Sequence, residues 1–364
     1  MSVTIKQIAE RTGLSIPTVG NVLGRASARY SEETRRKVFA AVEEMGYRPN
    51  ASARAIRQGK IGCAALVLSH GGLRTVSHLP IGLLDGVDEE LLQHNMHLSV
   101  SLLSDEELSN DEFIPKVLRE YVADGMIVNY THHIPARMLE LIDAHHTPAV
   151  WTNVKLASDC VHPDDRAAAH AATAALIAHG HRRIDLVHLM LSDVHPGLTF
   201  EQFRSRAHYS VDDRIEGYSS AMNAAGLSPR VRYDDRLVLP ADTVKECVSA
   251  MSAPDRSTAM IAYSENEVTP ILFAATQLGL SIPGDLVVLQ FAPIDQIIAG
   301  IRVPAIKIPT AEVGRRAVRM LLCKISAPDE LCEREAVAFE PLADDAVAPA
   351  KSGAQRKAGR RGSR

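Results

Sequence analysis

The sequence predicts a small all-α helix-turn-helix headpiece followed by a larger α/β core made of two lobes with parallel sheets. Three observations support this. Two short amphipathic helices flank a glycine turn within residues 4–23. Strand and helix patterns alternate from residue 61 to about residue 340. Between these two regions, residues 47–60 are rich in Pro, Asn, Ala, Ser, Arg and Gly, which is typical of a linker. At 364 residues, the chain suits a small domain plus a larger one.

The first stretch, TIKQIAERTGLSIPTVGNVL, has the pattern of two helices joined by a turn at Gly13. Thr4 and Ser15 can each cap the helix that follows them, because their hydroxyl groups accept from unpaired backbone amides. The apolar positions are Ile5, Ile8, Ala9, Ile16, Val19, Val22 and Leu23. The second helix should then present outward Pro17, Thr18, Asn21 and Arg25. On these twenty residues alone, a generic helical hairpin is the alternative.

A third helix follows at residues 31–46, and it makes the hairpin alternative weaker. Ser31 opens it, an apolar stripe of Val38, Ala41, Val42 and Met45 follows, and Gly46 ends it. After the helix comes YRPNASARAI. This order of motifs over residues 3–60 closely resembles the DNA-binding headpiece of the lactose-repressor and galactose-repressor (LacI/GalR) family. The resemblance implies a helix-turn-helix domain at residues 1–46 and a hinge at residues 47–60.

Contacts with double-stranded DNA are expected from both parts. In the headpiece, we expect phosphate contacts from Thr4, Ser15, Thr18 and Arg35. We expect base contacts from Pro17 and Asn21, and from Ile16 through a thymine methyl group. Arg25, on the same outward side of the second helix, is also expected to bind DNA. The resemblance implies a hinge helix in the minor groove that carries Asn50, Ala53, Arg54 and the apolar wedge Ile56. Gly20-Asn21 and Ile16-Pro17 depart from the family's usual residues, so the usual operator is not expected.

Charge is distributed unevenly along the chain. Residues 1–60 hold eleven Lys or Arg against five Glu, a net charge of +6. Residues 351–364 hold six Lys or Arg and no acid, again +6, so the formal total of −4 leaves −16 for residues 61–350. A basic headpiece fits the neutralisation of DNA phosphates. We expect residues 341–364 to be a disordered basic tail.

The pattern from residue 61 onward is that of a core with parallel sheets. Buried strands at 62–69, 97–104, 124–130, 183–191, 257–264 and 286–292 alternate with helical segments. The core also resembles the effector-binding core of the LacI/GalR family, which is similar to periplasmic binding proteins. The resemblance implies that lobe 1 comprises about 61–161 and 292–325, and lobe 2 about 162–291 and 326–340.

Ligands of open parallel sheets bind beyond the carboxyl ends of the strands, which here predicts a small-molecule effector between the lobes. The residues just after the strands include His70, Tyr130, Trp151, Ser264, Glu265 and Phe291. The resemblance adds Asp164 and Arg214 and favours a sugar or sugar derivative as the effector. Arg214 offers a planar fork to hydroxyl groups or a carboxylate, but a surface ion pair with Asp212 or Asp213 is its alternative.

Two further features qualify the predicted effector site. Trp151 could stack on a sugar ring or belong to the core. Ser264-Glu265 stands where the family usually has Asn-Asp, and Phe291-Ala292 stands where it has an aromatic residue and Asp, which predicts an unusual pocket.

Other classes of protein are less well supported. The His pairs at 132–133, 145–146 and 179/181 have spacings that point their side chains apart on a helix, and no catalytic motif or metal-binding motif occurs. The five cysteines are scattered and are expected to be core thiols. No membrane span or signal peptide is evident, so a cytoplasmic protein is expected. We expect neither catalysis nor a cofactor, but a homodimeric, ligand-responsive transcriptional regulator that acts as a repressor. A DNA-binding regulator controlled by a protein partner is the alternative.

Overall fold

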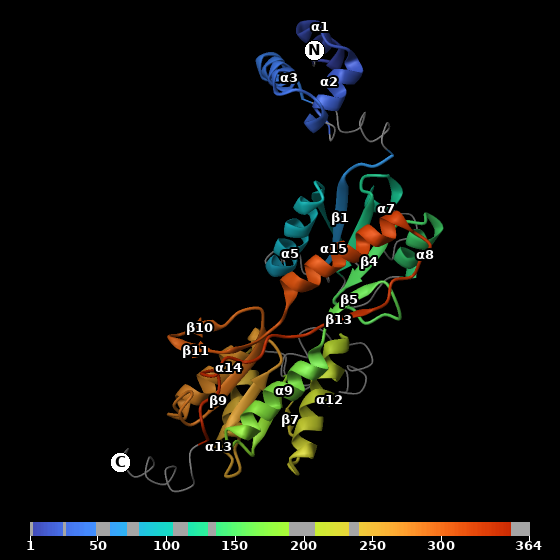
Figure 1. Ribbon diagram of the computed structural model, residues 1–364. Coiled ribbons are helices and arrows are strands. Elements are labelled where there is room, and N and C mark those ends of the chain that lie inside the picture. The colour runs from blue at the N-terminus through green and yellow to red at the C-terminus, as the bar shows by residue number, and fades with distance from the viewer. Residues whose placement is uncertain are drawn as a thin grey trace. The chain divides into compact units, whose positions relative to one another are not determined.

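A computed structural model describes residues 3–24, 27–48, 59–70, 80–104, 116–129, 136–188, 208–232 and 240–350 (Figure 1). The chain forms two compact units, Met1–Gly62 and Cys63–Arg364, which are considered separately below. None of the helices in these ranges is long and apolar enough to cross a membrane.

The first unit is a bundle of three helices. They are α1 (Ile5–Thr12), α2 (Ile16–Val22) and α3 (Glu32–Met45), with a 3-10 turn at Ser27–Arg29. Gly13 ends α1 in the left-handed conformation, as the turn requires. Ile8, Val19 and Val38 are completely buried at the centre, as the apolar spacing predicted. Ile16, which also belongs to the apolar positions of α2, is 44% exposed and is therefore accessible for the contact with a thymine methyl group that we expect from it.

Lobe 1 of the second unit contains a six-stranded parallel sheet in the order β13-β5-β4-β3-β1-β2. Its strands are β1 (Cys63–His70), β2 (His97–Ser104), β3 (Gly125–Asn129), β4 (Ala149–Thr152), β5 (Cys160–Pro163) and β13 (Glu335–Val337). Its helices are α5 (Ile81–Gln93), α7 (Lys116–Arg119), α8 (Ala136–Ala144) and α15 (Thr310–Ser326). Figure 1 shows α5 beside α15, and the two lie so close that a Cβ on Gly86 would meet the Ala311 carbonyl oxygen at 1.9 Å.

Lobe 2 contains a five-stranded parallel sheet in the order β12-β9-β8-β6-β7. Its strands are β6 (Ile184–Val187), β7 (Val231–Arg232), β8 (Ala259–Ala262), β9 (Val287–Ala292) and β12 (Ala305–Lys307), and β10 (Gln296–Ile298) and β11 (Ile301–Val303) form a separate hairpin. Its helices are α9 (Asp165–Ala178), α12 (Tyr209–Ala224), α13 (Pro240–Ser252) and α14 (Glu265–Gln277). Gly217 lets α12 approach α9, since a Cβ there would lie 2.1 Å from the Arg166 carbonyl oxygen.

The chain passes between the lobes three times, and two of the predicted crossing points need correction. The first crossing lies at residues 163–165, close to the predicted 161. The second lies near residue 309 rather than 291, because β12 pairs with β9 and keeps residues 292–307 in lobe 2. The third follows Val337 rather than residue 325, because β13 pairs with β5 of lobe 1.

The segment after β13 also differs from the prediction. Residues 341–350 were expected to begin a disordered tail, but Ala346 and Val347 are buried in the core of lobe 2 against residues that include Tyr218 and Ile184. The backbone amide of Ala350 donates to the carbonyl oxygen of His179. Residues 341–350 are therefore part of lobe 2, and only residues 351–364 of the predicted tail lie outside the described residues.

Candidate DNA-binding surface and effector site

The helix caps predicted in the headpiece are present. Thr4 forms a capping box with Gln7: the Gln7 amide donates to Thr4 Oγ1 at 3.4 Å, and the Thr4 amide donates to Gln7 Oε1 at 2.8 Å. Ser15 caps α2 by accepting from the Thr18 amide at 3.2 Å, and its hydroxyl lies 2.8 Å from the Thr18 hydroxyl. These bonds fix the start of α1 and of α2.

The exposed side of α2 combines apolar and polar side chains. Pro17 and Asn21 are exposed, Ile16 is largely exposed and Thr18 is half-buried. The Asn21 side-chain amide donates to the Tyr30 hydroxyl at 3.0 Å, an interaction that spacing alone did not indicate. Tyr30 therefore orients the Asn21 side chain, whose oxygen Oδ1 can accept a hydrogen bond from DNA.

Other predicted DNA contacts are placed only in part. Arg35 lies half-buried on α3. Arg25 and the hinge residues Asn50, Ala53, Arg54 and Ile56 lie outside the described residues.

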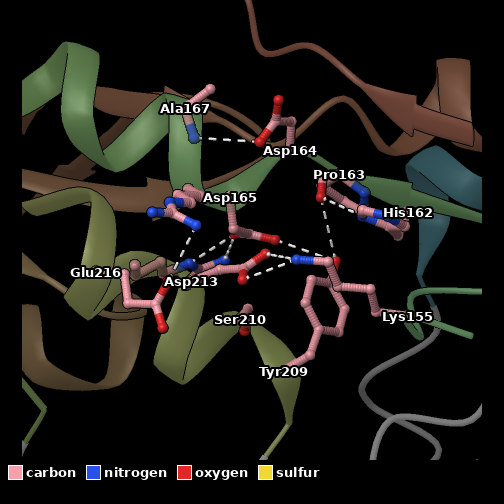
Figure 2. Close-up of polar contacts among 12 residues, drawn as sticks. Lys155, His162, Pro163, Asp164, Asp165, Ala167, Tyr209, Ser210, Asp213 and Glu216 are labelled. Atoms are coloured by element: carbon pink, nitrogen blue, oxygen red, sulfur yellow. Dashed lines mark hydrogen bonds and ion pairs between the residues drawn. The ribbon is translucent and has the colours of Figure 1, made fainter.

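In the core, Arg214 lies in a buried cluster in lobe 2. Arg214 on α12 is 6% exposed. Its Nε donates to Asp165 Oδ1 at 2.7 Å, and its Nη1 donates to the Tyr263 main-chain carbonyl oxygen at 2.6 Å. Figure 2 shows Asp165 at the start of α9, with the Tyr209 hydroxyl donating to its other oxygen at 3.1 Å. The alternative of a surface ion pair with Asp212 or Asp213 was wrong, because the partner of Arg214 is the buried Asp165.

Aromatic rings enclose the same guanidinium group. Its central carbon lies 3.9 Å from the centre of the Phe291 ring and 4.5 Å from that of Tyr263. The His188 ring stacks on Tyr263 at 4.0 Å between centres. Burial and the charge of Arg214 lower the pKa of His188 to about 3, so this imidazole is neutral at physiological pH. At the centre of the cluster, the Arg214 cation is therefore paired with the Asp165 carboxylate.

Ser264 and Glu265 lie at the start of α14. Ser264 is its N-cap, and both its amide and its hydroxyl donate to Glu267 Oε2, at 2.9 and 2.7 Å. Burial raises the pKa of Glu267 to about 7, although the bonds from Ser264 act in the opposite direction. Glu265, the predicted effector contact, is exposed and accepts from the Gln296 side chain at 2.5 Å.

The remaining predicted effector residues differ in accessibility. Asp164 is half-buried and caps α9 by accepting from the Ala167 amide at 3.1 Å (Figure 2). Trp151 is 5% exposed within the core of lobe 1, which supports the core alternative over stacking on a sugar. Phe291 is buried, and its ring packs against the Arg214 guanidinium group instead of lying at the protein surface. Tyr130 lies outside the described residues, as does the side chain of His70, whose backbone belongs to β1.

Two polar contacts join the lobes beside this cluster. Lys155 of lobe 1 lies 2.9 Å from both carboxylate oxygens of Asp213 in lobe 2 (Figure 2). His208 Nε2 donates to the Asn153 carbonyl oxygen at 2.5 Å, which leaves Nδ1 to accept from the Ser210 amide at the start of α12. Both contacts span the boundary between the lobes, so a change in lobe angle would strain or break them.

The sequence did not indicate several members of this cluster, namely Lys155, Asp165, His188, Tyr209, Asp213, Tyr263 and Glu267. Asp165 follows a predicted contact directly, but its partner Arg214 lies 49 residues further along the chain. The only available signal was the acidic pair Asp164-Asp165 at the start of a predicted helix.

Two of the His and Cys side chains differ in burial: His181 is buried and Cys323 is exposed. His181 is buried, with its ring nitrogens 2.8 Å from the Thr258 hydroxyl and 2.9 Å from the Ala348 carbonyl oxygen. Cys323 is exposed, against the prediction that all cysteines are core thiols. Within the described ranges, no group of three or more His, Cys, Asp or Glu side chains could hold a metal ion.

Fold and site together define a helix-turn-helix DNA-binding regulator with a two-lobed, periplasmic-binding-protein-like core. Residues 4–50 match the family of bacterial regulatory proteins, lacI family, and residues 173–338 match the periplasmic binding protein-like domain. Residues 4–50 are therefore a lacI-family DNA-binding domain, as the resemblance of their motifs indicated, and they precede a periplasmic-binding-protein-like domain.

Similar proteins cover nearly the whole chain. A probable HTH-type transcriptional regulator, EndR, of Paenibacillus polymyxa is 25% identical over 91% of this chain and 93% of its own length. The ribose operon repressor of Haemophilus influenzae is 25% identical over 90% of this chain and 93% of its own. Among solved structures, the Lac repressor dimer bound to operator and an anti-inducer has a TM-score of 0.69 at 19% identity, over 96% of this chain and 100% of that one. The complex of the transcriptional regulator CelR with cellobiose has a TM-score of 0.60 at 22% identity, over 94% of this chain and 98% of that one.

Proposed function

We propose that this protein is a homodimeric repressor whose affinity for a pseudo-palindromic operator is controlled by a sugar or sugar derivative bound between the lobes. The observation that carries the proposal is the headpiece: two capped helices present the exposed Pro17 and Asn21 on a basic domain that matches the lacI family. Relatives named as repressors, among them the ribose operon repressor, support repression as the outcome.

Dimerisation is supported by an apolar surface on lobe 1. Ile81 and Leu92 on α5 are 69% and 64% exposed, and Val100 and Leu102 on β2 are also exposed. β2 is the last strand of its sheet, so its outer edge has no described strand beside it. Exposed apolar side chains next to a free sheet edge are typical of a surface that a second subunit covers. Two headpieces would then read two half-sites.

The effector part rests on residues at the carboxyl ends of the lobe 2 strands. Tyr263 and Ser264 follow β8, Phe291 is the last residue but one of β9, and Asp164 lies at the crossing between the lobes. Because Asp165 already neutralises Arg214, we expect this cluster to favour a polyhydroxyl ligand over a carboxylate. The Lys155–Asp213 pair joins the lobes beside it and offers a contact that a change in lobe angle would break.

Two measurements test the proposal. Selection of bound sequences from random duplex DNA should recover a pseudo-palindrome, and Asn21→Ala should relax specificity at one position in each half-site. Tyr30→Phe is the matched variant, because it removes only the hydroxyl that orients Asn21 and should produce a weaker form of the same effect. Failure to recover any two-fold symmetric site would refute the homodimeric repressor.

The effector is tested by scanning fluorimetry against a sugar panel, since a ligand that binds the folded state raises the melting temperature. The discovered sugar should then change operator affinity by a free energy of roughly 1 to 3 kcal/mol, and operator should change sugar affinity equally. Asp164→Asn keeps the helix cap but removes the charge, so it should weaken the response without lowering stability, whereas Glu265→Gln is its exposed acidic control. If no sugar shifts either quantity, control by a protein partner becomes the better hypothesis.

A further inference from the structure

His162 is a buried histidine at the boundary between the two lobes. It lies on β5, one residue before the end of the strand, and the chain crosses into lobe 2 directly afterwards. The residue is 3% exposed. Figure 2 shows its ring near that of Tyr209 at the start of α12, and the two ring centres are 5.3 Å apart in an edge-to-face arrangement. His162 therefore belongs to lobe 1, and an aromatic ring of lobe 2 packs against it.

The hydrogen bond of one ring nitrogen fixes the chemistry of the other. His162 Nδ1 lies 2.8 Å from the carbonyl oxygen of Pro163 (Figure 2). A carbonyl oxygen only accepts, so Nδ1 carries the hydrogen and, in the neutral ring, Nε2 carries a lone pair. Within the part of the chain that the structure describes, this buried Nε2 has no hydrogen-bond partner. His162 therefore holds an acceptor without a donor.

A buried acceptor without a donor is unfavourable, and a bound molecule can supply the donor. Leaving such a group unpaired costs more than a typical hydrogen bond contributes, so nearly all buried polar groups in proteins have a partner. His181, which is equally buried, shows the ordinary case in this chain, because both of its ring nitrogens lie within 2.9 Å of a polar group of lobe 2. The contrast indicates that His162 Nε2 is available to a donor from outside the chain.

A second acceptor lies two residues further along. Asp164 is half-buried and uses Oδ1 to cap α9, and among the described residues no donor contacts its Oδ2. The two nearby cations are already occupied. Arg214 is paired with Asp165, and Lys155 is paired with Asp213. Two free acceptors beside neutralised cations favour a ligand that supplies hydroxyl hydrogens over a ligand that brings an anion.

We propose that His162 is an effector-binding residue, whose Nε2 accepts a hydrogen bond from a hydroxyl group of the sugar while Asp164 accepts a second one. The inference rests on the proposed function, because it assigns two hydrogen bonds to the sugar bound between the lobes. With the lobes as they stand, Nε2 is enclosed, so a sugar reaches it when the lobes part and is enclosed with it when they close. A deoxy derivative at that hydroxyl lacks the hydrogen, so the site should reject it.

The test uses the full chain and a panel of D-ribose, D-glucose, D-galactose, cellobiose and myo-inositol, with affinities measured by titration calorimetry. In His162→Asn, the side-chain amide can still donate to the Pro163 carbonyl oxygen, but Nε2 is gone. A panel sugar that binds the wild type should bind this variant about 5- to 150-fold more weakly, because one of its hydroxyl groups is then buried without an acceptor. His162→Gln places an amide oxygen near the position of Nε2 and should restore most of the affinity. His170→Asn, at an exposed position on α9, is the control and should leave the affinity unchanged.

A second readout locates the bond on the sugar. Among singly deoxygenated derivatives of the sugar that binds, one should bind the wild type more weakly than its parent does, yet bind His162→Asn as well as the parent does, because the same bond is lost only once. A third readout needs no variant to fold: the Nε2 resonance of His162 in nitrogen NMR spectra of the wild type should move when the sugar is added.

The outcomes separate this inference from the proposed function. Equal affinity of the wild type and His162→Asn for a panel sugar, or an unmoved Nε2 resonance on binding, would overturn the inference and leave the sugar-controlled repressor in place. If no panel sugar binds the wild type, the inference falls together with the sugar effector. Operator selection by the headpiece would stand in either case.

Discussion

Replacing Arg214 by Met should destabilise lobe 2 strongly while leaving its volume filled. The Arg214 side chain is 7% exposed and that of Asp165 is 1% exposed. Without the guanidinium group, the Asp165 carboxylate stays buried with the Tyr209 hydroxyl as its remaining described side-chain donor. Breaking one partner of a buried pair costs roughly 3 to 5 kcal/mol of unfolding free energy. For a lobe of this size, that loss lowers the melting temperature by about 6 to 20 °C.

Scanning calorimetry measures the melting temperature, and urea denaturation monitored by circular dichroism measures the free energy of unfolding. Lys245→Met on α13 is the control in the same lobe, because its pair with Asp242 is exposed and should contribute less than about 1 kcal/mol. The double variant Asp165→Asn with Arg214→Met should lose clearly less than the sum of the two single changes, since it leaves no unpaired buried charge. A loss below about 1 kcal/mol in Arg214→Met would refute the buried pair.

Three further predictions concern other parts of the chain. The pKa of Glu267 rises to about 7 on folding, so between about pH 4.5 and 7 the folded state holds a proton that the unfolded state has lost. The free energy of unfolding should therefore fall as pH rises from about 4.5 to 7. Glu267→Gln, which can still accept from Ser264, should remove that part of the pH dependence of urea denaturation. Gly217→Ala places a methyl group against the Arg166 carbonyl oxygen and should cost about 1 to 3 kcal/mol by calorimetry, whereas the exposed Ser220→Ala on the same helix should not. Thr4→Ala removes the cap of α1 and should lower headpiece stability by about 1 kcal/mol in thermal melts, and Thr4→Ser should restore it.

Local signals predicted the headpiece well. Thr4, Ser15 and Ser31 each cap the helix that they begin, and the bond in every case spans three residues. Such contacts depend only on neighbouring residues, so sequence spacing is enough to find them. Ile16 is apolar by spacing and yet 44% exposed, because helical periodicity shows that a face is apolar but not how far the packed face extends.

The core was harder because its decisive contacts are distant in sequence. Strand patterns placed the βα units, but only pairing shows that β12 belongs with β9 and β13 with β5, which moved two lobe boundaries. Asp165 and Arg214 are each ordinary surface residue types, and their mutual burial follows from the packing of α9 on α12. The tail prediction weighed the charge of residues 351–364 and overlooked the apolar pair Ala346-Val347 just before them.

The interleaving of the two lobes sets an order of events during protein synthesis. The headpiece is a contiguous unit of about sixty residues, but lobe 1 lacks β13 until Val337 is made, and lobe 2 lacks Ala346 and Val347 until a few residues later. At about 5 to 20 residues per second, the headpiece leaves the ribosome some 15 to 60 seconds before the core can be completed. A nascent chain therefore carries its DNA-reading unit well before it possesses the apparatus that would regulate it.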